Sequence, residues 1–216
     1  SQFNSLVLDD FGKVKSFVIP LPIAEIEESK PSPEEPPIVL FVGRIAPNKG
    51  IHDLVASMAV LREHLPDVRL RVVGTSTNDT YDAALEKLTT SLDLTGVVTL
   101  TGWVSDDELE REYQRASVFC TLSDHEGFGV PILEAMAYGL PIVAYDNTAV
   151  GETVGDAGLL LSSKEPAVVA SALDRVLSDT SLSGRLSRSG RQRSKLFSGE
   201  YVAEALDRAL SWSYSS

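Results

Sequence analysis

The amino-acid sequence predicts a three-layer α/β domain in which helices cover both faces of a mostly parallel sheet. Short apolar runs alternate with helical patterns between residues 38 and 198. Glycine or polar residues directly follow the first five of these runs. Alternation of this kind is typical of parallel sheets, because parallel neighbours are joined by crossover helices.

Each expected strand is a short apolar run. The first, Ile38 to Val42, contains no polar residue, as is typical of a strand that is buried on both faces. The five that follow are expected at residues 68–73, 97–101, 118–122, 141–145 and 159–161.

The segments between these runs show helical periodicity or helix-end signals. Residues 50–64 place apolar side chains on one stripe from Ile51 to Leu61. Ser105 is the expected N-cap of a helix at 106–116, whose first turn is acidic. Further helices are expected at residues 81–92, 130–138, 165–177, 181–196 and 201–210.

The 216 residues are enough for one α/β domain with a core, and we expect the chain to have three parts. The first part, residues 1–37, is expected to include a helix at 1–12, a short strand at 16–20 and an acidic, proline-rich linker at 26–37. Residues 38–198 form the α/β domain, and residues 199–216 form a C-terminal helix.

Composition and charge narrow the class of protein. The formal net charge is −12, so the chain as a whole repels nucleic acid and anionic membrane surfaces. The single cysteine, Cys120, closes an apolar run and is expected in the core. No apolar run is long enough to span a membrane, and no signal-peptide pattern is present. We therefore expect a cytoplasmic protein in a reducing compartment.

The most informative segment runs from Ser123 to Gly139 and reads SDHEGFGVPILEAMAYG. Glu126 and Glu134 are separated by seven residues, which include a Gly-Phe-Gly turn and Pro131. The glycines permit a tight turn that side chains would block, proline suits the first turn of a helix, and Gly139 suits its end. The segment therefore predicts a strand, a glycine turn and a short helix whose free N–H groups favour an anion.

Glu134 needs a polar partner, because it is the only charged residue from Gly127 through Tyr145. Burying a carboxylate without a hydrogen bond is expensive. The partner is a backbone group, a side chain or a ligand with hydroxyl groups. Under the simpler interpretation, Glu126 interacts with the helix dipole and Glu134 is a satisfied core carboxylate. Under the alternative, both belong to a ligand site.

The segment resembles the E-x7-E motif of retaining glycosyltransferases with the GT-B fold, the large family four group. The resemblance covers essentially the whole chain and implies a Rossmann-like domain that forms one half of a GT-B fold. Ser1–Asn4, of the form Ser-x-Phe-Asn, and Val18–Pro20 are similar to the end of that family's first domain. The resemblance thus implies a C-terminal, donor-binding domain, preceded in residues 1–37 by the end of the first domain and the interdomain linker.

The same resemblance implies roles for the residues of the segment. Glu134 would bind the ribose hydroxyls of a nucleotide-sugar donor, and Glu126 would lie near the donor sugar. The backbone of the turn would approach the sugar and the diphosphate. The implied donor contacts are Gly127, Phe128, Gly129 and Val130.

Two cations follow the first expected strand. Arg44 and Lys49 come just before a helix, where a cation opposes the helix dipole. This placement makes sense if an anion such as a diphosphate lies between them; otherwise they are solvated surface charges. The segment from Gly43 to Gly50 resembles the family's Gly-Arg…Lys-Gly motif, which implies that Arg44 and Lys49 bind the donor diphosphate and that Gly43 also contacts the donor.

Further candidates follow the second and third expected strands. We expect Gly74 to approach the nucleotide through its backbone. The resemblance implies nucleobase contacts for Val104 and Leu109. We expect Trp103 to pack against the domain rather than to stack on the base.

The segment at 146–152 resembles a loop in which the family often has Pro-Glu, and Gly151 replaces the proline. Glu152 is expected to brace this loop. His125 is expected to be a variable residue of the rim, the edge of the sheet formed by the loops that follow the carboxyl ends of the strands. The three histidines and the cysteine lack metal-ligand spacing, so we expect no metal site. The resemblance likewise implies that no metal or other cofactor is required.

The resulting hypothesis is the donor-binding half of a retaining glycosyltransferase, which transfers a sugar from a nucleotide diphosphate to an acceptor. Glu126, Arg44 and Lys49 are the candidate catalytic residues. A missing first domain would bind the acceptor and would make any contact with a membrane or lipid-linked acceptor. The alternatives are another sugar-nucleotide enzyme on the same fold, such as a non-hydrolysing epimerase, and a non-catalytic binding module.

Overall fold

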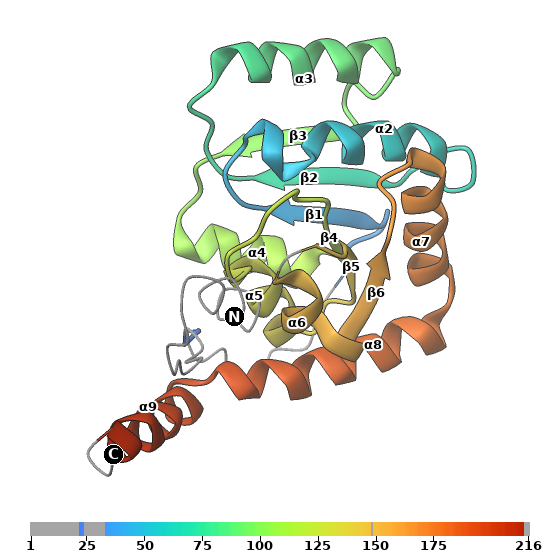
Figure 1. The fold of residues 1–216 in the computed structure, drawn as a ribbon. Coiled ribbons are helices and arrows are strands. Elements are labelled where there is room, and N and C mark those ends of the chain that lie inside the picture. Colours follow the sequence, from blue (N-terminus) through green and yellow to red (C-terminus); the bar gives the residue numbers. More distant parts are fainter. Residues whose placement is uncertain (1–21, 24–32, 148, 214–216) are drawn as a thin grey trace.

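The computed structural model describes residues 22–23, 33–147 and 149–213 (Figure 1). The helix expected at 1–12 and the strand expected at 16–20 lie outside the described residues, as does the expected linker up to residue 32. No helix within the described ranges is long and apolar enough to cross a membrane.

Six parallel strands form one sheet in the described part of the chain. The strands are β1 (Ile38–Val42), β2 (Arg69–Val73), β3 (Val98–Gly102), β4 (Val118–Thr121), β5 (Ile142–Tyr145) and β6 (Gly158–Leu161). Their order is β3-β2-β1-β4-β5-β6. Strands β2 and β3 extend the sheet from one side of β1, whereas β4, β5 and β6 extend it from the other side, so the strand order reverses between the neighbours β1 and β4. The loops that leave β1 and β4 are therefore neighbours, as at the ligand crevice of doubly wound sheets. The expected parallel α/β architecture is confirmed.

Helices cover both faces of this sheet (Figure 1). One layer contains α2 (Ile51–Leu61), α3 (Asp79–Ser91) and α7 (Pro166–Ser178). The other contains α4 (Asp106–Arg115), α5 (Val130–Tyr138) and α6 (Val150–Val154), with α8 (Thr180–Ser194) packed against α5. The 3-10 turns are η1 (Pro47–Lys49), η2 (Gly155–Ala157) and η3 (Lys195–Phe197). The last helix, α9 (Gly199–Ser213), leads away from the body of the domain (Figure 1).

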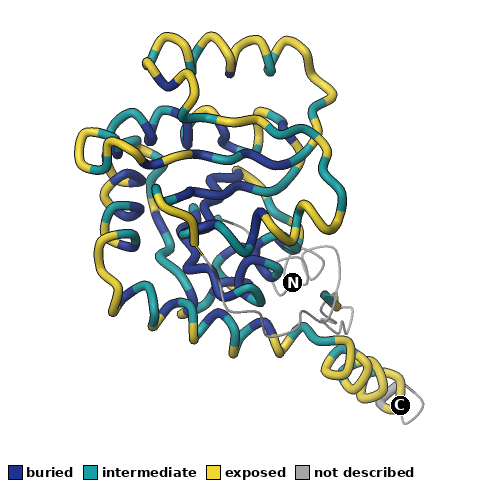
Figure 2. The backbone as a smooth tube through the Cα atoms, turned by 180° about the vertical axis from the view of Figure 1, so that it is seen from behind, coloured by how far each residue is buried: buried dark blue, intermediate teal, exposed yellow. Residues whose placement is uncertain are grey.

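The core consists of two apolar clusters, one on each face of the sheet. In β1, Val39 and Phe41 face one cluster while Ile38 and Leu40 face the other, which is why this strand contains no polar residue. Figure 2 shows buried backbone at the centre and exposed backbone along α3 and α9. Cys120 is fully buried as expected, and its burial raises the pKa of the thiol.

Two arginines of α8 hold the helices of the second layer. The guanidinium of Arg191 donates to the carbonyls of Ala137 (3.1 Å) and Tyr138 (2.7 Å), at the C-terminal end of α5. Arg193 donates to the carbonyl of Thr153 at 2.7 Å and also to that of Glu152, at the end of α6. Cations at these positions satisfy carbonyls that have no partner within the helix, and they complement the helix dipole.

The structure differs from the sequence prediction at residues 146–152. These were expected to form a loop, but α6 begins within them, at Val150. The helix is too short to show a periodic apolar pattern, and Gly151 within it is typical of a loop. An added Cβ at Gly151 would lie 2.6 Å from Oδ1 of Asp146, so a side chain there would require the exposed Asp146 carboxylate to move.

Candidate functional site

The loops that leave β1 and β4 are joined at the point where the strand order reverses. Gly50 has a φ of 63°, and a Cβ added there would lie 2.3 Å from the carbonyl oxygen of Leu122. The backbone N–H of Asp124 donates to the carbonyl of Asn48 at 2.8 Å. Only glycine permits this approach, so Gly50 docks the start of α2 against the end of β4.

An ion pair crosses the same junction. Nζ of Lys49 lies 2.6 Å from Oε1 of Glu126, and both side chains are largely buried, at 15% and 17% exposure. Oγ of Ser123 donates to the same oxygen at 2.7 Å, and Oγ1 of Thr121 lies 3.1 Å from the Ser123 hydroxyl. Two residues that the sequence marked in separate motifs are therefore in direct contact.

A second cation holds the loop after β4 from its other side. Nζ of Lys164, in the segment between β6 and α7, donates to Oδ1 of Asp124 and lies 3.3 Å from Oδ2 of Asp53. The ammonium also lies 5.3 Å from the centre of the Tyr145 ring. The loop is thus fixed through its acidic residues to two other parts of the chain, η1 and the segment between β6 and α7.

Glycines bring the ends of β1, β2 and β3 together. The Gly43 N–H donates to Val73 at 2.9 Å, and the Gly74 N–H donates to Gly102 at 3.1 Å. A Cβ on Gly74 would lie 1.9 Å from the carbonyl oxygen of Gly43, so the packing of these loops requires glycine there. Arg44 is exposed beside them, and it makes no hydrogen bond or ion pair with another described residue.

Glu134 lies in the second turn of α5 and is half-buried. The Tyr113 hydroxyl of α4 donates to its Oε2 at 2.7 Å. Burial raises the pKa of Glu134, the Tyr113 hydrogen bond lowers it and the Asp106 carboxylate raises it, leaving the pKa above its ordinary value. The carboxylate therefore has a side-chain partner, and it remains in an environment where its charge is incompletely stabilised.

The glycine turn before α5 has one constrained and one open glycine. Gly129 has a φ of 74° and is the N-cap of the helix, and Pro131 and Gly139 lie at its start and its end as expected. The prediction that a side chain would be blocked is wrong for Gly127, because no described atom lies within 4 Å of an added Cβ there. Gly127 is exposed, so the packing of the described residues does not exclude a side chain there.

Phe128 connects the turn to the C-terminal segment. Its ring meets that of Phe197 edge to face, with ring centres 5.7 Å apart. Its carbonyl accepts a hydrogen bond of 3.1 Å from the Thr153 hydroxyl of α6. Thr153 of α6 thus contacts the turn. Glu152 is exposed, and its expected role in bracing the loop at 146–152 stays a prediction. The neighbouring Val130 is half-buried.

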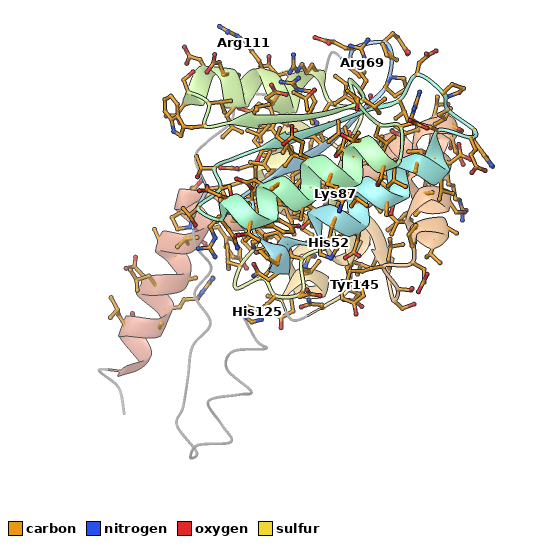
Figure 3. The ribbon with its side chains drawn as sticks, turned by 90° about the horizontal axis from the view of Figure 1, so that it is seen from above. His52, Arg69, Lys87, Arg111, His125 and Tyr145 are labelled. Carbon is orange, nitrogen blue, oxygen red and sulfur yellow. The ribbon has the colours of Figure 1, made fainter. Side chains whose placement is uncertain are left out.

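The rim after β3 differs in part from expectation. Val104 and Leu109 are half-buried and pack against the second apolar cluster. The expectation that Trp103 packs against the domain is wrong, because 77% of its surface is exposed. β3 forms the edge of the described sheet, so no neighbouring strand among the described residues covers the tryptophan that follows it. His125 is exposed at the outer edge of the molecule (Figure 3).

Three side chains at the rim carry no clear signal of their own in the sequence. Ser123 lies next to the recognised acidic residues, so only its place in that segment could have suggested a contact with Glu126. Tyr113 and Thr153 come from other segments, and no spacing rule connects them to the turn. Among the described residues, no group of three or more His, Cys, Asp or Glu side chains could hold a metal ion.

Comparison with known proteins identifies the family. Residues 22–193 match the family described as Glycosyl transferases group 1, and the chain belongs to this family. A D-inositol 3-phosphate glycosyltransferase from Nocardioides sp. is 34% identical over 188 residues, which cover 79% of this chain and 40% of that protein. An O-antigen chain mannosyltransferase B from Escherichia coli is 30% identical, over 74% of this chain and 42% of its own. The chain thus spans about two fifths of these relatives.

Solved structures of glycosyltransferases share the fold. A sucrose-phosphate synthase from Thermosynechococcus elongatus has a TM-score of 0.84 at 28% identity, covering 100% of this chain and 57% of that one. The Anabaena protein HepE, solved with UDP and glucose, has a TM-score of 0.74 at 25% identity, covering 81% of this chain and 48% of its own. These neighbours are GT-B enzymes, so the predicted Rossmann-like half of a GT-B fold is confirmed.

Proposed function

We propose that this chain is the donor-binding half of a retaining glycosyltransferase. Residues 38–198 form the nucleotide-sugar domain, residues 1–37 the end of the first domain with the linker, and residues 199–216 the C-terminal helix. The observation that carries the proposal is the contact between Lys49 and Glu126, which unites the two motifs of the family at the strand-order reversal.

Arg44 and Lys49 bind the donor diphosphate in this proposal. Arg44 is exposed beside the glycine backbone at the ends of β1 and β2, where its guanidinium can form paired hydrogen bonds with phosphate oxygens. Lys49 donates to Glu126, and its ammonium has two further hydrogens to offer. The two cations stabilise the negative charge that develops on the leaving diphosphate.

The two glutamates bind different parts of the donor. Glu134 accepts hydrogen bonds from the ribose hydroxyls, and Glu126 orients the transferred sugar together with the turn at Gly127–Gly129. Glu126 is fixed by Lys49 and Ser123, which supports a positioning role near the reacting carbon. Gly43, Gly74, Phe128 and Val130 line the donor, while Val104 and Leu109 meet the base.

The complete protein transfers the sugar, which we propose to be a hexose, and the chain alone does not. The acceptor binds to a first domain, and closure of the two domains assembles the reaction site and excludes water. The protein acts in the cytoplasm or at the membrane periphery. Donor binding needs no divalent metal, because the two cations supply the positive charge.

A thermal-shift screen tests the proposal. Uridine, guanosine and adenosine diphosphates and their sugars are added to the 216-residue chain at millimolar concentration, with and without EDTA. At least one should raise the melting temperature equally well in EDTA, because a ligand of the native state stabilises it by mass action. No shift with any of them would contradict the donor site, and a shift that EDTA abolishes would contradict metal-free binding.

A further inference from the structure

Tyr113 is the described side chain that hydrogen-bonds Glu134, and it belongs to neither family motif. Its hydroxyl lies 2.7 Å from Oε2 of Glu134 and 3.5 Å from the carbonyl oxygen of Pro131. The phenol thus lies at the first turns of α5, beside the helix that carries the carboxylate. A hydrogen bond to a charged oxygen is the stronger kind and fixes the direction of its acceptor.

The position of this phenol is set by packing on both sides. Only 1% of the Tyr113 surface is exposed. Its ring stacks on that of Tyr138, with centres 5.1 Å apart and planes 12° from parallel, and it lies 6.5 Å from the Phe119 ring of β4. Packing prevents a ring enclosed in this way from moving with the carboxylate. The hydrogen bond from its hydroxyl therefore fixes the orientation of the carboxylate.

The hydrogen bond leaves acceptor capacity on Glu134. An ionised carboxylate has about four acceptor positions on two oxygens, and the Tyr113 hydroxyl takes one of them. No second hydrogen bond to this carboxylate comes from the residues that the structure describes. The Tyr113 hydroxyl also stabilises the ionised form against burial and against the Asp106 carboxylate. Both features suit a carboxylate that accepts from two neighbouring hydroxyls.

We propose that Tyr113 is a positioning residue, whose hydroxyl holds Glu134 in the orientation that selects a ribonucleotide over a 2′-deoxyribonucleotide. This inference rests on the proposed function, because it assumes that a nucleoside diphosphate binds at this rim. A positioning role differs from a purely structural one, because the loss of a structural hydrogen bond would weaken the binding of the ribo and deoxy nucleotides equally.

The test is a calorimetric titration of the full chain with a nucleoside diphosphate and with its 2′-deoxy form. Tyr113→Phe removes the hydroxyl and keeps the ring. The matched control is Tyr138→Phe, which removes a phenol that gives no hydrogen bond to Glu134 within the described chain. Tyr113→Phe should lower the affinity for the ribonucleotide by about tenfold, the usual effect of losing one charge-assisted hydrogen bond. The affinity for the deoxy form should fall by less. Tyr138→Phe should preserve the wild-type ratio.

A folded Tyr113→Phe variant that keeps the wild-type ribo-to-deoxy ratio would overturn the inference. If the half-buried carboxylate, left without its hydrogen bond, prevents this variant from folding, the double variant Tyr113→Phe/Glu134→Gln removes that charge. Its ratio should equal that of Glu134→Gln alone, and a different ratio would overturn the inference as well. Failure of the proposed function looks different, because the wild type would then bind neither form.

Discussion

Glu112 and Glu134 lie on neighbouring helices of the same layer, yet their carboxylates differ in their hydrogen-bond partners and in the direction of their pKa shifts. Glu112 is 6% exposed and accepts two hydrogen bonds of 2.6 Å from Arg71 and two more from Arg115. Burial raises its pKa, but the two guanidinium groups outweigh burial and leave the pKa below its ordinary value. Glu134 receives one phenol hydroxyl and has a raised pKa.

The difference separates a structural carboxylate from one that is available to a ligand. Four hydrogen bonds satisfy the acceptor positions of Glu112, so nothing remains for another molecule. Glu134 lies at the rim, where its carboxylate has unused hydrogen-bond acceptor positions and its charge is poorly compensated. Perturbed carboxylates of this kind are typical of functional sites.

The largest expected effect is on stability, from Glu112→Gln. Removing one partner of a buried ion pair leaves the other charges uncompensated, so the free energy of unfolding should fall by about 3 kcal/mol. Urea denaturation measures this change. Glu110→Gln is the matched control, because Glu110 is exposed on the same helix. Nucleotide binding should survive in folded Glu112→Gln, whereas a stability loss as small as that of Glu110→Gln would contradict the structural role.

Next come the two cations of the proposed diphosphate site. Arg44→Ala and Lys49→Ala should each weaken nucleoside diphosphate binding by about ten- to a hundredfold, the effect of losing a charge-assisted hydrogen bond. Nucleoside binding should change far less, because the nucleoside has no diphosphate. Calorimetry with both ligands measures the difference, and Lys87→Ala, on the exposed face of α3, is the control (Figure 3). Equal losses for both ligands would indicate general destabilisation instead.

The sequence predicted most of the fold, because the strands are short apolar runs with turn residues after them. It failed at α6, where five residues are too few for a periodic pattern, and at Trp103, whose exposure depends on β3 being an edge strand. It identified the residues of the Lys49–Glu126 pair by resemblance, but their contact follows from the strand order. Tyr113 was missed because its role depends on how α4 packs against α5.

The titration of Glu112 and Glu134 should make stability depend on pH, and this effect should be smaller than those of the substitutions above. Glu112 has a lowered folded-state pKa, so its contribution is present above the unfolded value of about 4.3 and is lost as the pH falls through the folded pKa. Glu134 has the opposite sign: its contribution is present below the unfolded pKa and is lost as the pH rises through its folded pKa.

Glu134→Gln should therefore be at least as stable as the wild type at pH 7, and any advantage should disappear at pH values below both pKa values. Urea denaturation across this range checks the sign. A variant that is clearly less stable than the wild type at pH 7 would make Glu134 a structural carboxylate like Glu112.

The most direct test of the central claim is a titration of the wild type, Glu134→Gln and Glu126→Gln with a nucleoside diphosphate and its 2′-deoxy form. If Glu134 binds the ribose hydroxyls, the wild type prefers the ribo form, Glu134→Gln binds the two forms more nearly equally, and Glu126→Gln keeps the preference. If Glu126→Gln loses the preference instead, the two roles are reversed. If neither variant loses it, Glu134 is a satisfied core carboxylate, and the account of this site is wrong.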